Sequence, residues 1–317
     1  MTPDLQKCEM SASTSLRAGM RYVLVTAAYN EERFIEQTIQ SVIGQTVLPL
    51  RWVIVSDASI DRTDEIVDAY ARQHEFIQLH RITKKHPRNF AAQVLAIRTG
   101  YEVLRDLDFE FIGNLDADVA MDSSYFETLL GHFRVEPGLG LSGGNICEEV
   151  DGEYRTRPSN NFKSVPHAVQ MFRRTCFDAV GGYLPMKYGG PDWVAEVRAR
   201  QLGWAVRSYP DLPVRHYRPT CAAEGKLRAW WRQGQMDYSV GSLFLFEVVK
   251  CARRVRGHPV FVGAAVRLLA YCVAYAKREP RQVSENFVRF LQREQRNRLL
   301  AMFGWRSNEV RLSNRGT

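Results

Sequence analysis

The first 118 residues alternate between short apolar runs and longer segments in which apolar and polar positions mix. The apolar runs lie at 22–28, 52–56, 76–81 and 109–115. In the segments between them, apolar residues recur three and four positions apart, as at Ile35, Ile39 and Val42, which is the spacing of one helix face. Strands that alternate with helices in this way predict an α/β fold, with a mostly parallel sheet and helices on both faces.

Residues at the ends of these segments predict where the helices begin and end. Asn30 is the expected N-cap of the first helix and Gly44 its expected end. Beyond residue 118 we expect a helix from about Ser123 and a strand at 139–145 with close backbone approach at its glycines. A polar loop at 147–164, expected to lie over the ligand site, and a strand at 169–173 would follow. A helix at 193–202 would then follow, with Asp192 as its cap.

Carboxylates follow the strands of this predicted sheet. The stretch FIGNLDADV ends in Asp116 and Asp118, and Asp57 follows the run at 52–56. The carboxyl ends of parallel strands share one edge, and ligands of such sheets bind there. Carboxylates two positions apart in an extended segment face the same side, and Mg²⁺ or Mn²⁺ favours such oxygen ligands. The stretch therefore predicts a divalent cation site, and a solvated turn is the alternative.

Charge is distributed unevenly along the chain. Residues 1–214 contain 23 Lys and Arg against 28 Asp and Glu, a net charge of −5, whereas residues 215–317 contain 20 against 7, a net charge of +13, which together give the formal +8. A basic back third favours a polyanionic partner such as anionic lipid, a phosphorylated acceptor or nucleic acid. A solvated helical surface rich in arginine is the alternative.

The back third is predicted to be helical from 226 to 303, with breaks at Gly241, at Gly257-His258-Pro259 and at Pro280. The run Val260–Ala276 is apolar apart from Arg267. It is shorter than the roughly 20 residues that a membrane span needs, so we expect a buried or interfacial helix. Basic residues flank this run on both sides, which suits an anionic membrane surface.

Nucleic acid is not an expected partner, because the aromatic residues of the back third lie in apolar helical stretches and are expected in a core. These are Trp230, Trp231, Tyr238, Phe244 and Phe246. The six cysteines are scattered without a Cys-x-x-Cys pair, which argues against zinc and favours reduced thiols in the cytoplasm. The polar, Ser/Thr-rich residues 1–20 predict a disordered lead-in without the apolar core of a signal peptide.

Five motifs in this order resemble those of the family 2 glycosyltransferases. They are VTAAYNEE, VSDASIDRT, LDADV, RRTCFDAVGGY and GGPDWVAEVRARQLGW, the last followed by VRHY. The resemblance implies a GT-A nucleotide-sugar-binding domain of Rossmann-like topology at residues 21–218, and leaves a basic helical region at 219–317. It also implies sugar transfer with inversion from a nucleoside-diphosphate sugar, assisted by Mn²⁺ or Mg²⁺.

The resemblance also implies roles for particular residues. Ala28, Asn30 and Glu31 would lie along the nucleotide, and Asp57 would bind its base. Asp116 would contact the ribose or the metal shell. Two further residues, Asp118 and His216, would hold the metal on the diphosphate. Asp192 falls at the position of the general base that deprotonates the acceptor hydroxyl.

Three features refine this picture. Pro191 precedes Asp192, and Ser56 precedes Asp57, where relatives often carry a second acidic residue. A Gln-x-x-Arg-Trp motif and membrane spans, typical of processive polymer synthases, are missing from the sequence. We therefore expect addition of one or a few sugars to a glycan or lipid-linked acceptor, at the inner face of a membrane. The basic loop Lys84–Arg88 would help hold phosphate or form a solvated turn.

Two other functions fit parts of the pattern. A sugar-phosphate nucleotidyltransferase has a similar sheet, but it would carry a basic, glycine-rich loop after the first strand, where this chain has AAYNEE. A catalytically inactive nucleotide-sugar-binding protein would be expected to lack Asp118 or Asp192, and both are present.

Overall fold

The computed structural model describes residues 21–83, 90–150, 152–157, 160–218, 225–255 and 259–302. The chain divides into two compact units. One comprises Met1–Pro185 with Pro191–Pro219, and the other comprises Met186–Gly190 with Thr220–Thr317. We call them the sheet unit and the helical unit and describe each by itself. The expected lead-in at 1–20 and the basic loop Lys84–Arg88 lie outside the described residues.

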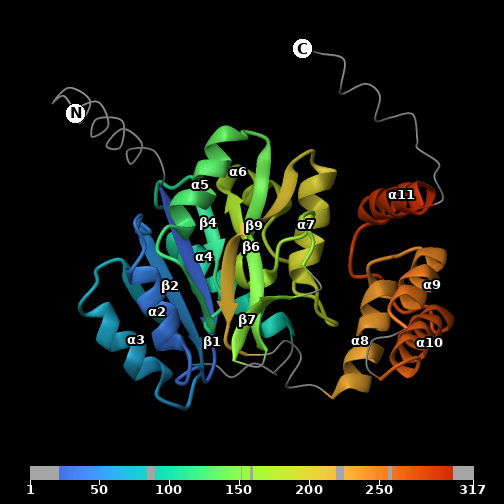
Figure 1. The fold of residues 1–317 in the computed structure, drawn as a ribbon, viewed down its shortest axis with the longest axis horizontal. Coiled ribbons are helices and arrows are strands. Elements are labelled where there is room, and N and C mark those ends of the chain that lie inside the picture. Colours follow the sequence, from blue (N-terminus) through green and yellow to red (C-terminus); the bar gives the residue numbers. More distant parts are fainter. Residues whose placement is uncertain are drawn as a thin grey trace, which may run out of the picture. The chain divides into compact units, whose positions relative to one another are not determined.

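The sheet unit is built on one nine-stranded sheet of the described residues, in the order β3-β2-β1-β4-β8-β6-β9-β5, with β7 paired to β6 (Figure 1). Its first part is parallel throughout. The strands there are β1 (Tyr22–Ala28), β2 (Arg51–Asp57), β3 (Ile77–Ile82) and β4 (Phe111–Asn114). Their carboxyl ends therefore lie along one edge, as the sequence predicted.

The second part of the sheet is mixed. It contains β5 (Val119–Met121), β6 (Leu139–Val150), β7 (Glu153–Thr156), β8 (Met171–Arg173) and β9 (Ala205–His216). β6 runs parallel to β9, whereas β8 is antiparallel to β4 and β6, and β5 is antiparallel to β9. This arrangement brings the end of β9 beside the start of β5, directly after the predicted Asp-x-Asp.

Helices cover both faces of the sheet, as expected from strands that are apolar on both sides. Alternate residues of β1 point to opposite faces: Tyr22 and Leu24 belong to one hydrophobic cluster, and Val23 and Val25 to the other. The helices that follow the strands are α2 (Ile35–Ile43), α3 (Thr63–Ala71), α4 (Phe90–Leu104), α5 (Tyr125–Val135), α6 (Arg174–Val180) and α7 (Pro191–Gln201). The predicted α/β class is confirmed.

Two predicted helix caps are wrong. α2 begins at Ile35, five residues after Asn30, and Asn30 has a left-handed backbone with φ 52°. Asparagine tolerates that conformation better than most residues, so Asn30 makes the turn of a loop instead. α7 begins at Pro191, whose fixed φ suits the first helical position, so Asp192 lies in the first turn and is not the cap.

The predicted loop at 147–164 is partly wrong, because β6 continues to Val150 and pairs with β7 as a hairpin. The polar composition of this stretch reflects its exposure, since the four residues of β7 are all exposed. β9 was missed as a strand, because Pro210 and Pro213 interrupt its pattern. The register of β6 on β9 shifts between Gly144 and Asn145, an irregularity of the kind at which a sheet accommodates proline.

Close backbone approach at the two glycines of β6 is confirmed. A Cβ atom on Gly144 would lie 2.1 Å from the carbonyl oxygen of Leu212, and one on Gly143 would lie 2.4 Å from that of Val169. Both contacts are closer than a side chain allows.

The helical unit contains α8 (Lys226–Ser239), α9 (Phe244–Arg253), α10 (Val262–Ala276) and α11 (Glu285–Met302). The breaks at Gly241 and Pro280 are confirmed, and Gly257-His258 lies outside the described residues. α8 and α10 pack closely, because a Cβ atom on Gly234 would lie 2.1 Å from the carbonyl oxygen of Arg267. Within the described residues, no helix has both the length and the apolar character to cross a bilayer.

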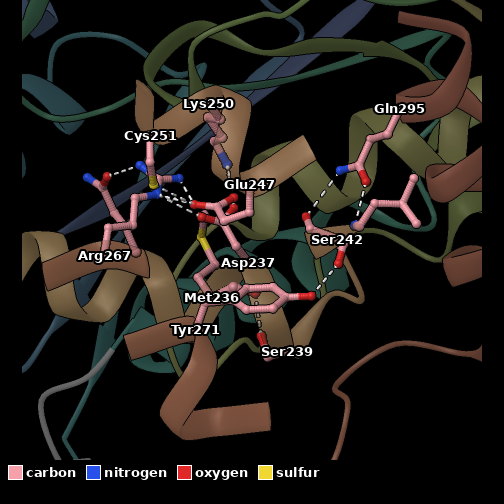
Figure 2. Close-up of polar contacts among 12 residues, drawn as sticks. Met236, Asp237, Ser239, Ser242, Glu247, Lys250, Cys251, Arg267, Tyr271 and Gln295 are labelled. Atoms are coloured by element: carbon pink, nitrogen blue, oxygen red, sulfur yellow. Dashed lines mark hydrogen bonds and ion pairs between the residues drawn. The ribbon is translucent and has the colours of Figure 1, made fainter. Parts of the chain in front are cut away.

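Four charged side chains gather inside this unit (Figure 2). Arg267 of α10 donates from Nε to Oδ2 of Asp237 at 2.9 Å and to Oε1 of Glu247 at 2.8 Å. Lys250 donates to Oδ1 of Asp237 at 2.6 Å and to Oε2 of Glu247 at 3.3 Å. All except Lys250 are buried. We call these four residues the paired cluster, because its two carboxylates and two cations balance.

Candidate functional site

The loops that follow β1 and β2 are tied to each other at the carboxyl edge. Oδ1 of Asn30 accepts the backbone N–H of Ile60 at 2.9 Å, and the backbone N–H of Asn30 donates to Oγ of Ser59 at 3.2 Å. The backbone N–H of Glu31 donates to Oγ1 of Thr63 at 2.7 Å. The left-handed backbone of Asn30 thus serves to join two loops over the ends of the strands.

Asp57 lies beside these loops at the end of β2. Ala28 at the end of β1 pairs in register with Ser56, the residue directly before Asp57. Asp57 is half-buried, and its carboxylate makes no hydrogen bond or ion pair with any described residue. Ala58, directly after it, has φ 56°, and strain of this kind gathers at functional sites. Of the predicted nucleotide residues, Ala28, Asn30 and Glu31 therefore lie at the same edge as Asp57.

Asp116 lies in the loop after β4, against a histidine that the sequence analysis did not single out. Oδ1 of Asp116 lies 3.3 Å from Nδ1 of His167, and Nδ2 of Asn114 donates to the carbonyl oxygen of His167 at 2.7 Å. Burial alone would raise the pKa of Asp116, but the neighbouring His167 holds it below its usual value. The same contact raises the pKa of His167 against the effect of its burial.

Asp118 faces His216, because the antiparallel pairing of β5 with β9 sets Val119 opposite His216. Nε2 of His216 lies 3.4 Å from Oδ1 of Asp118, and Nδ1 lies 3.9 Å from a carboxylate oxygen of Glu148. Burial lowers the pKa of His216, but the hydrogen bond and charge of Asp118 outweigh it and raise the pKa.

Arg218 bridges the two halves of this edge. Its Nε lies 3.5 Å from Oδ2 of Asp118, and its guanidinium pairs with the carboxylate of Glu31. Burial raises the pKa of Glu31 to about 7, although Arg218 opposes the shift, and the charges of Asp118 and Asp116 add to it. The edge therefore gathers more negative than positive charge at neutral pH.

Asp192 lies close enough to this group for its charge to contribute to the raised pKa of His167. It is half-buried in the first turn of α7 and makes no hydrogen bond or ion pair with any described residue. Glu196, one turn further along α7, is buried, and burial together with the Asp192 charge raises its pKa to about 8. Its Oε1 accepts the backbone N–H of Val165 at 2.7 Å.

Asp118 and His216 are the residues that best fit a divalent cation. Nδ1 of His216 is buried without a hydrogen-bond partner among the described residues, which leaves the ring free to adjust to a ligand. The described part of the chain holds no group of three or more His, Cys, Asp or Glu that could hold a metal ion. A cation at this pair would need further oxygen ligands, and a bound diphosphate offers them.

Three residues of this edge were not assigned a role from the sequence. Arg218 follows His216 by two positions, and residues so spaced in an extended segment face the same side. Glu196 follows Asp192 by four positions, the spacing of one helix face. Both could have been found in this way. His167 is a single histidine in an irregular stretch, and no local pattern marks it.

Comparisons with known proteins agree with this architecture. Residues 23–189 match the family Glycosyl transferase family 2, which is more than half of the chain. The chain therefore belongs to glycosyl transferase family 2, as its motifs predicted. It is 26% identical over 127 residues to poly-beta-1,6-N-acetyl-D-glucosamine synthase of Staphylococcus epidermidis, a match that covers 40% of this chain and 28% of that synthase.

Solved structures of GT-A transferases share the fold. S. aureus TarS 1-349 in complex with UDP-GlcNAc has a TM-score of 0.54 at 13% identity, over 89% of this chain and 92% of that one. The mannosyltransferase PcManGT of Pyrobaculum calidifontis, in complex with GDP-Man and Mn²⁺, has a TM-score of 0.53 at 17% identity, over 92% and 83%. These likenesses establish the fold.

Proposed function

We propose that this chain transfers a sugar, with inversion, from a nucleoside-diphosphate sugar to a hydroxyl of a glycan or lipid-linked acceptor. The observation that carries the proposal is the surplus of carboxylates at the carboxyl edge of the sheet, where the carboxylates of Asp57 and Asp192 make no hydrogen bond or ion pair with a described residue. Carboxylates that outnumber the nearby cations in this way are characteristic of functional sites.

The nucleotide would lie over the joined loops that follow β1 and β2. Asp57 can accept hydrogen bonds from a base, because its carboxylate is not engaged by described residues. Ala28 is buried at the end of β1, directly before the loop that would carry the nucleotide. Asn30 and Glu31 fix the loop on one side, and Asp116, held by His167, faces the sugar–phosphate part.

Asp118 and His216 would hold a divalent cation. When bound, such a cation supplies positive charge that stabilises the diphosphate as it leaves. Arg218 would contribute a fixed positive charge beside it, since its guanidinium already lies between Asp118 and Glu31. A charge aimed at a developing anion in a water-poor site is among the larger contributions to catalysis.

Asp192 would take the proton of the attacking hydroxyl. Its carboxylate is half-buried, near His167 and free of partners among the described residues. One base on the face opposite the leaving group is what single inversion requires, and such a base contributes roughly 10²–10⁴-fold. Glu196 would position the helix that carries Asp192, since it bonds the backbone at Val165.

The acceptor class is proposed from the relatives and not from the geometry. The synthase of S. epidermidis is named for a polysaccharide product, which supports a growing glycan or its lipid-linked form as the acceptor class. The chain has no Gln-x-x-Arg-Trp motif, so we propose addition of one or a few sugars.

The test is a thermal-shift panel of UDP, GDP, CDP, ADP and dTDP, each with and without Mn²⁺. A ligand at about 100 times its Kd stabilises the folded protein by roughly 2.7 kcal/mol, so one diphosphate should raise Tm, and only with metal. Asp118→Ala should abolish the metal-dependent shift. Asp211→Ala is the matched control, because Asp211 is an exposed carboxylate on β9, and it should keep the shift.

Two outcomes would contradict the proposal. A panel without any shift in Tm would show that the proposed donor site does not bind a nucleoside diphosphate. A Mn²⁺-dependent shift that survives in Asp118→Ala would show that Asp118 does not hold the metal. Release of the same diphosphate from its sugar nucleotide, measured next, separates an enzyme from a protein that only binds the donor.

A further inference from the structure

The outward face of α10 is a continuous exposed apolar surface. The exposed and half-buried residues of this face are Val262, Ala265, Val266, Leu268, Leu269, Cys272, Val273, Tyr275 and Ala276. Leu269 is 56% exposed and Tyr275 is 69% exposed. None of these side chains carries a charge, and exposed apolar patches of this kind mark interaction sites. We call this surface the α10 face.

The single charge in α10 does not interrupt the face. Arg267 points inward to the paired cluster, where it bonds Asp237 and Glu247 (Figure 2). Most of the other inward residues of α10 are small, such as Gly263 and Ala270, and allow close packing on α8. The exception is Tyr271, which is buried and donates its hydroxyl to the carbonyl oxygen of Ser242 at 2.6 Å. The sequence of α10 therefore places its charge inside the unit and most of its bulky apolar residues outside, the reverse of an ordinary surface helix.

An exposed aromatic residue stands at each end of the α10 face, and basic residues follow its C-terminal end. Phe261 at the start is 68% exposed. At the other end, Tyr275 is followed by the exposed Lys277 and Arg278. Aromatic rings and long cationic side chains of this kind are suited to the level of lipid headgroups.

We propose that the α10 face docks in the plane of a bilayer that contains anionic lipid. An apolar helix face with basic residues at its rim is the arrangement of an interfacial helix, and the net charge of +13 in residues 215–317 attracts acidic headgroups. A second copy of this chain would offer another apolar face but also the same positive charge, which opposes its approach. The charge therefore favours lipid, and this proposal does not depend on the proposed function.

Cys272 lies on the α10 face as an exposed free thiol, and it allows a direct test in the full chain. An environment-sensitive fluorophore is attached there in the variant Cys8→Ser/Cys221→Ser, in which the buried Cys147, Cys176 and Cys251 are the only other thiols. The emission should shift to the blue with vesicles of phosphatidylcholine and phosphatidylglycerol. The shift should fall with phosphatidylcholine alone and with added salt, which screens the attraction of headgroups.

As a control for the probe at Cys272, the same fluorophore is attached to the sheet unit. This variant adds Val135→Cys and Cys272→Ser to Cys8→Ser/Cys221→Ser. Val135 is an apolar residue that is 85% exposed, and its probe should not shift. In flotation of the unlabelled protein, Leu269→Glu should lower binding to the acidic vesicles at least tenfold, whereas Val135→Glu should leave it unchanged. Both positions are exposed, so both variants should fold, which circular dichroism checks.

Three results would overturn the proposal. These are a probe at Cys272 that does not shift with acidic vesicles, equal loss of binding in both glutamate variants, and a shift that rises with protein concentration without vesicles. The last would identify a second copy as the occupant. Because the diphosphate panel needs no lipid, failure here and failure of the proposed function are distinguishable.

Discussion

The two units bury charged side chains in opposite ways. In the helical unit, the paired cluster balances Asp237 and Glu247 with Lys250 and Arg267, and every member is bonded to another (Figure 2). At the carboxyl edge of the sheet unit, Glu31, Asp116, Asp118 and Asp192 outnumber the one guanidinium and two histidines beside them. The charges of the paired cluster balance without a ligand, whereas those of the carboxyl edge do not.

This difference separates structure from function. Buried charges that satisfy each other hold helices in register, and removing one leaves the others unpaired. Burial raises the pKa of Glu31, and the charges of Asp118 and Asp116 add to this shift although Arg218 opposes it. Carboxylates with shifted pKa values of this kind gather at functional sites. Breaking the paired cluster should therefore harm stability, whereas changing the carboxyl edge should harm activity without loss of stability.

The largest expected effect on stability is that of Arg267→Met. It leaves Asp237 and Glu247 buried without their main partner, so the free energy of unfolding should fall by about 3–5 kcal/mol. Urea denaturation of the full chain, followed by circular dichroism, measures it. Arg296→Met on the exposed side of α11 is the control and should change stability by no more than about 0.5 kcal/mol.

The charge explanation can be separated from lost packing. Adding Glu247→Gln to Arg267→Met removes the surplus negative charge, keeps the shape of that side chain and leaves Asp237 paired with Lys250, so stability should recover in large part. If the double variant is as unstable as Arg267→Met alone, loss of packing against Trp230 and not unpaired charge explains the effect.

The largest expected effect on activity is that of Asp192→Asn. Removal of the proposed base should slow release of the diphosphate from the donor in the presence of acceptor by roughly 10²–10⁴-fold. Binding of the diphosphate and the urea midpoint should stay within error of the wild type, because the Asp192 carboxylate makes no hydrogen bond or ion pair with a described residue. Rates near those of the wild type would remove Asp192 from the role, and Asp211→Asn serves as the exposed control.

A smaller, pH-dependent effect is expected of Glu196→Gln. The pKa of Glu196 is raised to about 8 by burial and by Asp192, so the folded state binds its proton more tightly than the unfolded state. Its contribution to stability is complete below the carboxyl pKa of an unfolded chain, about 4.3, and is lost as pH rises towards 8. Glutamine cannot titrate, so Glu196→Gln should gain stability over the wild type by about 1–3 kcal/mol between pH 5 and pH 8.

Thermal unfolding at several pH values measures this difference. A gap between the two proteins that is the same at pH 5 and pH 8 would show that Glu196 does not change protonation in this range. Glu136→Gln on the surface of the sheet unit, where Glu136 pairs with Arg207, provides the control for a carboxylate near solvent.

Much of the fold followed from local pattern. β1 at Tyr22–Ala28 and the end of α2 at Gly44 were predicted where they occur, because apolar runs and a closing glycine act through neighbours in sequence. β9 was not predicted, because its two prolines and charged residues are tolerated only through pairing with β6, some 65 residues away. The turn at Asn30 likewise depends on its bond to Ile60.

The candidate site was likewise predicted only where it depends on local pattern. Residue type and spacing were enough to predict the family, the alternation of strands and helices, and the carboxylates at strand ends. The three-dimensional structure was needed to find Arg218 between Glu31 and Asp118, His167 against Asp116, and Arg267 pointing inward. Such contacts join residues distant in sequence, and the free energy that selects them comes from packing of whole elements, which no local pattern contains.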